Sequence, residues 1–294
     1  MWGRFLRNHS LLKLVTLWSA TIAVHLWLIF EAAQNAQTAP FNDVNLYGIW
    51  SEQASAGGAL LGVRAPWVYP FVAMVPMFLA KLIGGSQGIL TGWLILIGLL
   101  NLIGLSAICD WGKADKKAFR AAGFYLAFLV LLGPVSIGRI DSVATFAALL
   151  GLVQVYRGRL RLAMMVFTIG AWIKIWPIAA AISLYTSAKQ RLPVLLVAIL
   201  TSAAVLAVGL FLGGNENLFS FVAMQGNRGL QVESVAATFW VWAAKVNLPG
   251  VGIYFDPALV TNQVSGSFTG EVSSLLSIVM LAALAITAWL SFNA

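Results

Sequence analysis

The chain has few of the residues on which many kinds of site depend. Its 294 residues include one cysteine, Cys109, and two histidines, His9 and His25. A single cysteine excludes an intramolecular disulfide and a cysteine-rich metal site. The sequence also has no Walker A loop, no Gly-rich dinucleotide fingerprint and no zinc motif. We therefore expect no metal and no cofactor.

Charged residues are scarce as well, at 10% of the chain, whereas 60% of its residues are apolar. This composition excludes an ordinary soluble fold. A helix needs about 20 apolar residues to cross a hydrocarbon core about 30 Å thick, and four segments come close to that length: 11–30, 89–108, 192–212 and 272–292. The first is too long for a secretory signal and lacks a clean cleavage site after it. We predict an all-α integral membrane protein, a polytopic helical bundle in which residues 1–294 form a single transmembrane domain.

The positive charge is clustered. Four groups hold 12 of the 18 basic residues: Arg4, Arg7 and Lys13; Lys113, Lys116, Lys117 and Arg120; Arg157, Arg159 and Arg161; Lys189 and Arg191. Short loops rich in Lys and Arg stay in the cytoplasm. The net charge of +8 is therefore a topology signal and does not indicate a nucleic-acid partner. We predict a multi-pass plasma-membrane protein with a cytoplasmic N-terminus.

Between two cytoplasmic loops the chain must cross the membrane an even number of times. Residues 121–156 then form two crossings with a turn at 137–141, and residues 162–188 form two short crossings with Lys174 and Pro177 near the turn. Each short helix has about 12 residues, or roughly 18 Å, less than the hydrocarbon thickness. Lys174 should therefore lie below the lipid headgroups. The alternative is one kinked helix over 162–185, which would reverse the sidedness of everything after it.

The first outer loop is predicted to span 31–87 and to contain an interfacial helix at 67–83. That apolar stretch is broken by Pro70 and Pro76, and an odd number of crossings must separate the first span from the basic loop at 113–120. The span at 89–108 supplies one crossing, so 67–83 lies in or dips into the outer interface, with Lys81 reaching toward the headgroups. The alternative is an ordinary kinked span, with one basic loop misplaced.

This topology gathers ionisable residues on the outward face: Glu31, Asp43, Glu52, Arg64, Arg139, Asp141, Lys174, Glu216, Arg228, Glu233, Asp256 and Glu271. Such groups at membrane depth are costly and usually line a polar cavity. With no histidine on this face, a histidine metal site or a Ser-His-Asp arrangement lacks its parts. Carboxylates and cations remain.

These two ingredients suit the transfer of a sugar from a lipid-linked phosphate. A carboxylate, for which Asp43 is our candidate, removes the proton from the acceptor hydroxyl as a general base. Arg139 and Lys174, at the predicted turns, bind the phosphate and stabilise it as it leaves. Phosphate is a good leaving group, so the second carboxylic acid of glycoside hydrolysis is not required.

Five segments carry a resemblance to a known family: the Asp43-containing first outer loop; Tyr69-Pro70; Gly138-Arg139-Ile140-Asp141; Ala171-Trp172-Ile173-Lys174-Ile175-Trp176-Pro177; and Arg228-Gly229-Leu230-Gln231-Val232-Glu233-Ser234. Over residues 11–242 the chain resembles the polyprenol-phosphate-mannose-dependent mannosyltransferases of bacteria with a mycobacterial type of envelope. These belong to the C-type class of integral-membrane glycosyltransferases. The order and spacing of the segments are more specific than any one segment alone.

The resemblance implies a polyprenyl-phosphate donor carrying a hexose, expected to be mannose, and a glycolipid or polysaccharide acceptor in the envelope. Transfer would take place on the outer face, with inversion and without metal. The general base falls on Asp43, and the donor site falls on Arg139, Asp141, Lys174, Arg228 and Glu233. Family members continue through further membrane helices, so a chain ending at Ala294 is expected to be C-terminally truncated or a divergent short form.

Simpler interpretations stay open beside these. Asp43 is also compatible with an ordinary loop aspartate, and Arg139 with a structural ion pair to Asp141, the latter capping the next span. Two other functions use the same features: a non-catalytic membrane subunit, and a transporter of lipid or solute with a similar cavity. A last group of residues is expected to be solvated, namely Glu52, Asp256 and Glu271. Sugar stacking on Trp50 or Trp67 is a further hypothesis.

Overall fold

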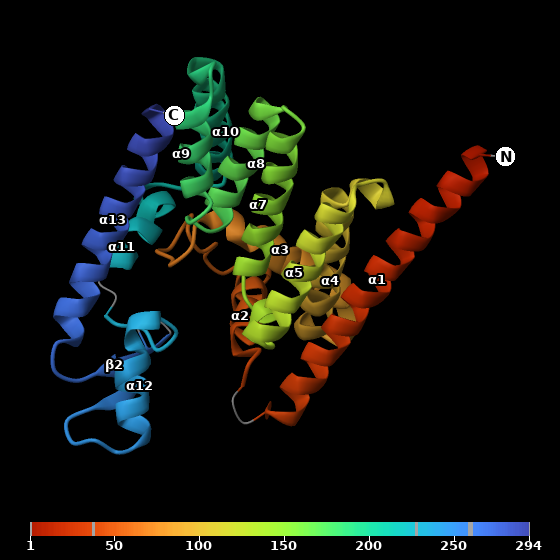
Figure 1. Ribbon diagram of the computed structural model, residues 1–294. Helices are drawn as coiled ribbons and strands as arrows, with labels where there is room; N and C mark the ends of the chain where they lie inside the picture. Colours follow the sequence, from red (N-terminus) through yellow and green to blue (C-terminus); the bar gives the residue numbers. More distant parts are fainter. Residues whose placement is uncertain (1, 37–38, 227–228, 258–260, 294) are drawn as a thin grey trace.

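The computed structural model of the chain describes residues 2–36, 39–226, 229–257 and 261–293 (Figure 1). About 75% of the chain is helical, which confirms the prediction that helices dominate.

The four predicted spans are confirmed as long apolar helices. They are α1 (Trp2–Gln34), α4 (Ile89–Ile108), α10 (Arg191–Phe211) and α13 (Thr269–Asn293), and each contains a stretch long and apolar enough to cross a membrane. In α13 none of the most apolar window is buried inside the protein. Such a face is unfavourable in water and is typical of a helix in contact with lipid.

Shorter helices complete the bundle: α5 (Lys116–Leu132), α6 (Val135–Gly138), α7 (Asp141–Tyr156), α8 (Leu160–Ile173) and α9 (Ile178–Ser187). The chain reverses between α8 and α9, where Lys174 has an extended backbone and Pro177 precedes the new helix. Residues 158–162, at the start of α8, and residues 187–190, at the end of α9, line one cavity. Hence α8 and α9 are antiparallel, as expected from charge, and the single kinked helix is wrong.

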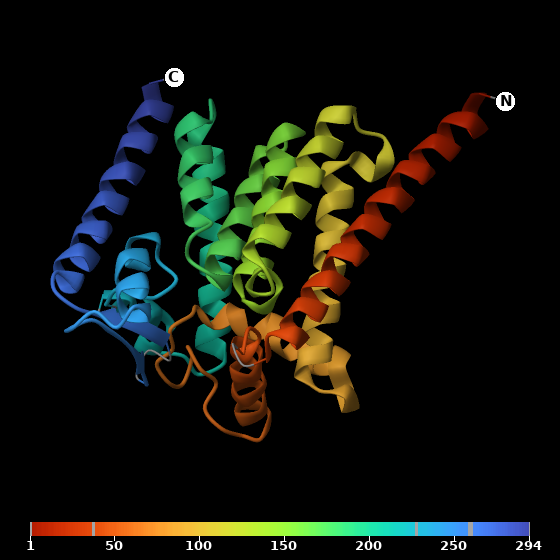
Figure 2. The same cartoon turned by 60° about the horizontal axis from the view of Figure 1, so that its bottom comes forward.

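Several contacts bring the basic clusters to one end of the bundle, here called the basic end. Arg157 forms an ion pair of 2.9 Å with Asp110, in η4 (Asp110–Gly112) after α4. Arg191 at the start of α10 donates to the carbonyl oxygen of Phe292 at the end of α13, at 3.4 Å. Both chain termini lie at this end (Figure 2). The basic loops thus share one side, while its cytoplasmic location stays a prediction.

The opposite end, here called the cavity end, contains α2 (Asn42–Ser55), η2 (Phe71–Ala73), α3 (Met74–Gly84) and η3 (Gly85–Gln87). The expected interfacial helix is shorter than 67–83, because Pro70 lacks an N–H and disfavours helical backbone in the residue before it. With 11 residues, α3 is roughly 16 Å long and too short to cross a membrane. Lys81 forms an ion pair of 2.7 Å with Glu52 on α2.

The chain after α10 folds beside the cavity end (Figure 1). Its elements are η5 (Glu216–Phe219), α11 (Ser220–Gly226), η6 (Val235–Ala237), α12 (Thr238–Lys245), β1 (Gly252–Asp256) and β2 (Thr261–Ser265). The two strands are antiparallel, with Gly252 opposite Ser265 and Asp256 opposite Thr261. This short hairpin is an exception to the predicted all-α architecture, and its residue Val264 packs with Trp240 and Leu230.

Candidate functional site

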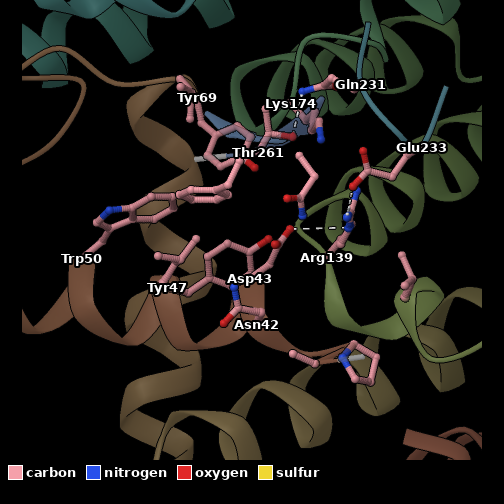
Figure 3. A pocket seen from close by; sticks show the side chains of 17 residues that line it. Asn42, Asp43, Tyr47, Trp50, Tyr69, Arg139, Lys174, Gln231, Glu233 and Thr261 are labelled. Atoms are coloured by element: carbon pink, nitrogen blue, oxygen red, sulfur yellow. Dashed lines mark hydrogen bonds and ion pairs between the residues drawn. The ribbon is translucent and has the colours of Figure 1, made fainter. Parts of the chain in front are cut away.

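A cavity of about 340 Å³ opens at the cavity end (Figure 3). It lies between α2, the turn before α7, the break after α8, and the segment that runs into the hairpin. The residues that line it include Asp43, Tyr47, Trp50, Tyr69, Arg139, Lys174, Gln231, Glu233, Thr261 and Asn262. Segments more than 200 residues apart in the sequence thus line one cavity.

Asp43 lies in the first turn of α2 and points into the cavity. Its side chain is 32% exposed, and its Oδ2 lies 3.5 Å from Nε of Arg139. Burial raises the pKa of this carboxyl, although Arg139 and Lys174 act in the opposite direction. Asp43 is thus a stronger base than a solvent-exposed aspartate.

Arg139 lies at the centre of the charged cluster. Its Nη2 donates to Oε1 of Glu233 at 2.7 Å, while its Nε faces Asp43. Burial lowers the pKa of the guanidinium, but the hydrogen bond with Glu233 and the charge of Asp43 outweigh it, so the net shift is upward. Arg139 therefore stays charged and joins α2 to the segment before α12.

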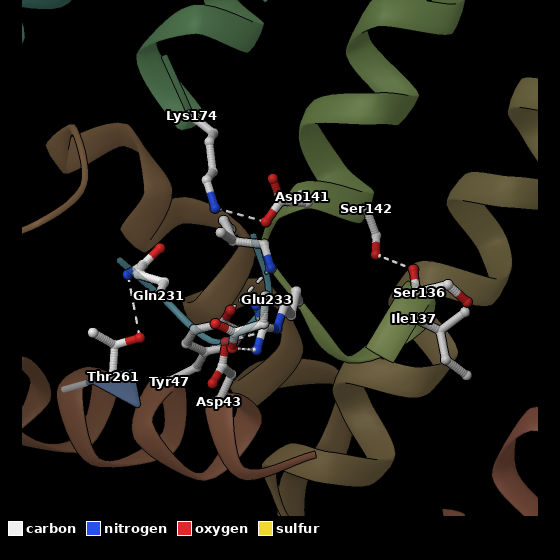
Figure 4. A network of polar contacts seen from close by, with 12 residues as sticks. Asp43, Tyr47, Ser136, Ile137, Asp141, Ser142, Lys174, Gln231, Glu233 and Thr261 are labelled. Atoms are coloured by element: carbon white, nitrogen blue, oxygen red, sulfur yellow. Dashed lines mark hydrogen bonds and ion pairs between the residues drawn. The ribbon is translucent and has the colours of Figure 1, made fainter. Parts of the chain in front are cut away.

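Lys174 supplies the second cation. The helix α8 ends one residue earlier, and the extended backbone at Lys174 turns its side chain toward Asp141. Its Nζ lies 2.6 Å from Oδ2 of Asp141 and 5.4 Å from the ring centroid of Tyr69. Asp141 on α7 is thus the ion-pair partner of Lys174 (Figure 4).

The alternative in which Asp141 caps the next helix and pairs with Arg139 was wrong. Asp141 is the first residue of α7, and its N-cap, Ile140, has no side-chain capping hydrogen bond. Among ion pairs between described residues, Arg139 pairs with Asp43 and Glu233, whereas Asp141 pairs with Lys174. The charges therefore connect different segments instead of neighbours along the chain.

Hydrogen bonds from α2, α4 and α7 fix the turn that carries Arg139. The hydroxyl oxygen of Tyr47, a side chain 1% exposed, accepts from the backbone N–H of Ile140 at 2.9 Å. The indole N–H of Trp93 on α4 donates to the carbonyl oxygen of Ile137 at 3.0 Å, and Ser142 donates its hydroxyl hydrogen to the carbonyl of Ser136 (Figure 4). Buried backbone groups satisfied in this way hold the turn in one position.

The lack of a side chain at Gly138 lets this turn approach α2. A Cβ at Gly138 would lie 2.8 Å from Cδ1 of Phe41 and 3.1 Å from the carbonyl oxygen of Pro40. These two residues directly precede the turn of α2 that contains Asp43. The glycine therefore sets the separation between the carboxylate and Arg139.

Aromatic rings form another wall of the cavity. Trp50 and Tyr69 line the cavity, with ring centroids 6.2 Å apart. Trp67 packs edge-on against both rings, with centroid distances of 5.4 Å and 5.3 Å, and does not line the cavity. Of the two tryptophans considered for sugar stacking, only Trp50 therefore faces the cavity.

Tyr47 also lines the cavity. Burial raises the pKa of its phenol well above 10, which makes it unsuitable as a base near neutral pH.

Neutral polar groups border the cavity on the hairpin side. The amide nitrogen of Gln231 donates to Oγ1 of Thr261 at 3.2 Å, and Asn262 lines the same wall. The sequence analysis missed these residues and also the supports Tyr47 and Trp93. No local signal marks them, because the pairing of residues 230–232 with β2 is a tertiary contact.

The structure brings four of the predicted site residues to the cavity, namely Asp43, Arg139, Lys174 and Glu233. Asp141 contacts it only through Lys174. Arg228 lies outside the described residues. The carboxylates expected to be solvated lie elsewhere: Glu52 pairs with Lys81, Asp256 accepts from Gln263 at 2.7 Å, and Glu271 is exposed in the first turn of α13.

The cluster has three carboxylates and two cations, or a formal charge of −1. Lys174 has three N–H donors, and Asp141 accepts from one of them, so the lysine has further donors for an anionic ligand. Among the described residues no group of three or more His, Cys, Asp or Glu is arranged to hold a metal ion.

The arrangement therefore offers a base of raised pKa, two fixed cations, an aromatic wall and neutral hydrogen-bonding groups around one space. Comparison of the chain with protein-family models, with curated proteins and with solved structures found no match.

Proposed function

We propose that this cavity transfers a hexose from a polyprenyl-phosphate donor to a hydroxyl group of an envelope glycolipid or polysaccharide. One observation carries the proposal: Asp43, Arg139 and Lys174 come from three distant segments and line the same cavity. This reaction needs at least a base for the acceptor proton and cations for the departing phosphate.

In the transfer step Asp43 accepts the proton of the acceptor hydroxyl. The acceptor oxygen forms a bond to the anomeric carbon, and the bond between that carbon and the phosphate oxygen breaks. Its electron pair goes to the polyprenyl phosphate, which changes from a singly charged diester to a monoester with one more negative charge. Attack from the face opposite the leaving phosphate inverts the anomeric configuration, and Asp43 afterwards releases its proton to water.

The cations act mainly on the charge that develops on the phosphate. Arg139 and Lys174 are held in place by carboxylates before any ligand binds, so little reorganisation is needed during the reaction. Because the departing phosphate is more negative than the donor, its attraction to both cations increases toward the transition state. Such differential binding raises the rate of the chemical step.

The other walls suit a sugar. The rings of Trp50 and Tyr69 offer an apolar face for the C–H side of a hexose, and Gln231 and Thr261 offer hydrogen bonds to its hydroxyls. Exposed apolar flanks of the long helices suit the polyprenyl chain. The identity of the hexose as mannose and the choice of an envelope acceptor both rest on the resemblance of the five segments described above.

The proposed location is the outer face of the plasma membrane. The cavity and the basic clusters lie at opposite ends of the bundle, and loops rich in Lys and Arg are retained in the cytoplasm. If the basic end is cytoplasmic, the cavity opens outward.

The deciding experiment is incubation of the purified protein with polyprenyl-phosphate-linked mannose and an envelope glycolipid extract, followed by mass spectrometry. A gain of one hexose by a glycolipid is expected, and Asp43→Asn protein serves as the matched blank. Donor binding without product would favour a non-catalytic subunit. Movement of the donor across a liposome membrane without product would favour a transporter.

Binding of the donor tests the cation wall separately from the chemistry. Arg139→Ala and Lys174→Ala should both weaken donor binding and lower the rate, since each side chain contacts the phosphate in this proposal. Unchanged donor affinity in both variants would show that the phosphate binds elsewhere.

A further inference from the structure

A second cavity, of about 730 Å³, lies at the basic end, far from the proposed active site. It is bordered by the loop that enters α8 and by the turn between α9 and α10. Arg159, Arg161 and Lys189 line it, all three exposed, and none of its lining residues is acidic. The cations that pair with carboxylates at this end, such as Arg157, lie outside its lining.

Two helices begin at this cavity without a cap. Neither α8 nor α10 has a capping hydrogen bond from a side chain, and neither has an acidic residue in its first turn. By contrast α5, which also begins at the basic end, is capped by Asp115, whose carboxylate accepts from the N–H groups of Lys117 and Ala118. The free N–H groups and the positive ends of two helix dipoles thus add to the three cations.

Two helices of opposite polarity end beside this cavity, α7 at Tyr156 and α9 at Ser187. The last carbonyl oxygens of α7 accept from the backbone N–H groups of the residues that follow it, Arg157, Gly158 and Arg159. At the end of α9, Nη2 of Arg191 donates to the carbonyl oxygen of Thr186 at 3.1 Å. The local field is therefore positive, and it attracts an anion.

The cavity continues into apolar surface. Leu162 lines it and begins an exposed face of α8 that continues through Met165 and Ile169 at helical spacing. On α10, Leu192 and Leu196 begin a similar exposed face. The two helices pack together, with a hydrogen bond of 3.1 Å from the indole of Trp172 to Ser202. Cations at the rim of the cavity complement the phosphate of a phospholipid, and the apolar faces beside them complement its acyl chains.

We propose that this cavity binds one anionic phospholipid. Its phosphate lies among Arg159, Arg161 and Lys189, and its acyl chains lie along the exposed faces of α8 and α10. Basic pockets between membrane helices on the cytoplasmic side are known to hold anionic headgroups. A free phosphate ion would gain nothing from the apolar faces, so the complementary ligand is a lipid. The site is independent of the glycosyl-transfer proposal.

Native mass spectrometry of the purified protein in mild detergent tests this site. Phosphatidylglycerol and phosphatidylcholine with the same acyl chains are titrated onto the wild-type protein and two triple variants. The test variant is Arg159→Gln, Arg161→Gln, Lys189→Gln. The control, Lys113→Gln, Lys116→Gln, Lys117→Gln, removes the same charge from the same end of the bundle.

One phosphatidylglycerol should bind the wild-type protein in preference to phosphatidylcholine. The test variant should bind it about a hundredfold more weakly, as expected for loss of three cations at one headgroup, and the control should match the wild type. Equal binding of both lipids by the wild type would overturn the proposal without any variant. Equal weakening in the control, or displacement of the lipid by inorganic phosphate, would overturn it as well.

Discussion

Replacing Asp43 by asparagine keeps the size of the side chain and removes both its charge and its ability to accept a proton. The carboxylate is about one-third exposed, and its ion pair with Arg139 is 3.5 Å long. An ion pair of this kind contributes less than about 1 kcal/mol to the free energy of unfolding. Folding and expression should therefore be nearly unaffected.

The effect on the chemical step should be much larger. Loss of a general base lowers the rate by about 10² to 10⁴-fold, which corresponds to roughly 3 to 5 kcal/mol in the activation barrier. The two magnitudes differ enough to separate a catalytic role from a structural one. Initial rates of hexose transfer at saturating donor, together with the donor dissociation constant, measure this directly. The dissociation constant should change little.

Glu52→Gln is the matched control for this experiment. Glu52 lies on the same helix as Asp43, carries the same charge and has an ion pair of its own, with Lys81, but it does not line the cavity. Its replacement should leave transfer unchanged. If Asp43→Asn protein kept more than about a tenth of wild-type turnover, the base would lie elsewhere, with Asp141 as the next candidate. Equal losses in both variants would point to charge alone.

Three further predictions follow from the surroundings of the base. Because only the ionised form of Asp43 accepts a proton, the transfer rate should fall as the pH drops through the raised pKa of this carboxyl. Arg139→Gln removes a charge that lowers this pKa, so it should move the acidic limb of the pH–rate profile to higher pH. An acidic limb that does not move would assign the titration to another group. Tyr47→Phe leaves the buried N–H of Ile140 without its acceptor, which costs about 1 to 3 kcal/mol, so the thermal midpoint in detergent should fall, and an unchanged midpoint would contradict the hydrogen bond. Gly138→Ala places a methyl group 2.8 Å from an aromatic ring carbon, so transfer should decrease, whereas full activity would show that the turn moves without consequence.

The sequence predicted the long helices and the grouping of the basic loops well, because both depend on properties of local segments. Hydrophobic length marks the spans, and the clustered Lys and Arg residues mark one end of the bundle. It did not predict α2 or the hairpin. A helix of 14 residues is marginal in isolation, and α2 is stabilised by burial of Tyr47 against Trp93, with ring centroids 4.7 Å apart. That contact is not visible in a local pattern.

The candidate site was predictable in its charges and not in its pairings. Charged residues are rare in this chain, which marked Asp43, Arg139 and Lys174 as candidates, whereas Glu233 was assigned to the site through the resemblance of its segment to the mannosyltransferases. Sequence proximity suggested an ion pair of Arg139 with Asp141, whereas the fold pairs each with a distant segment. The neutral lining has no such signal, because amides and hydroxyls occur throughout the loops and acquire a role only through packing.

The double engagement of Arg139, which joins α2 to the segment before α12, has a consequence for synthesis. As the ribosome releases the chain into the bilayer, Asp43 emerges first, Arg139 and Lys174 follow, and Glu233 comes almost 200 residues after Asp43. Until Glu233 has been synthesised, Arg139 lacks one of its two carboxylate partners. The cavity is therefore complete only after Thr261 and Asn262, which also line it, have been synthesised.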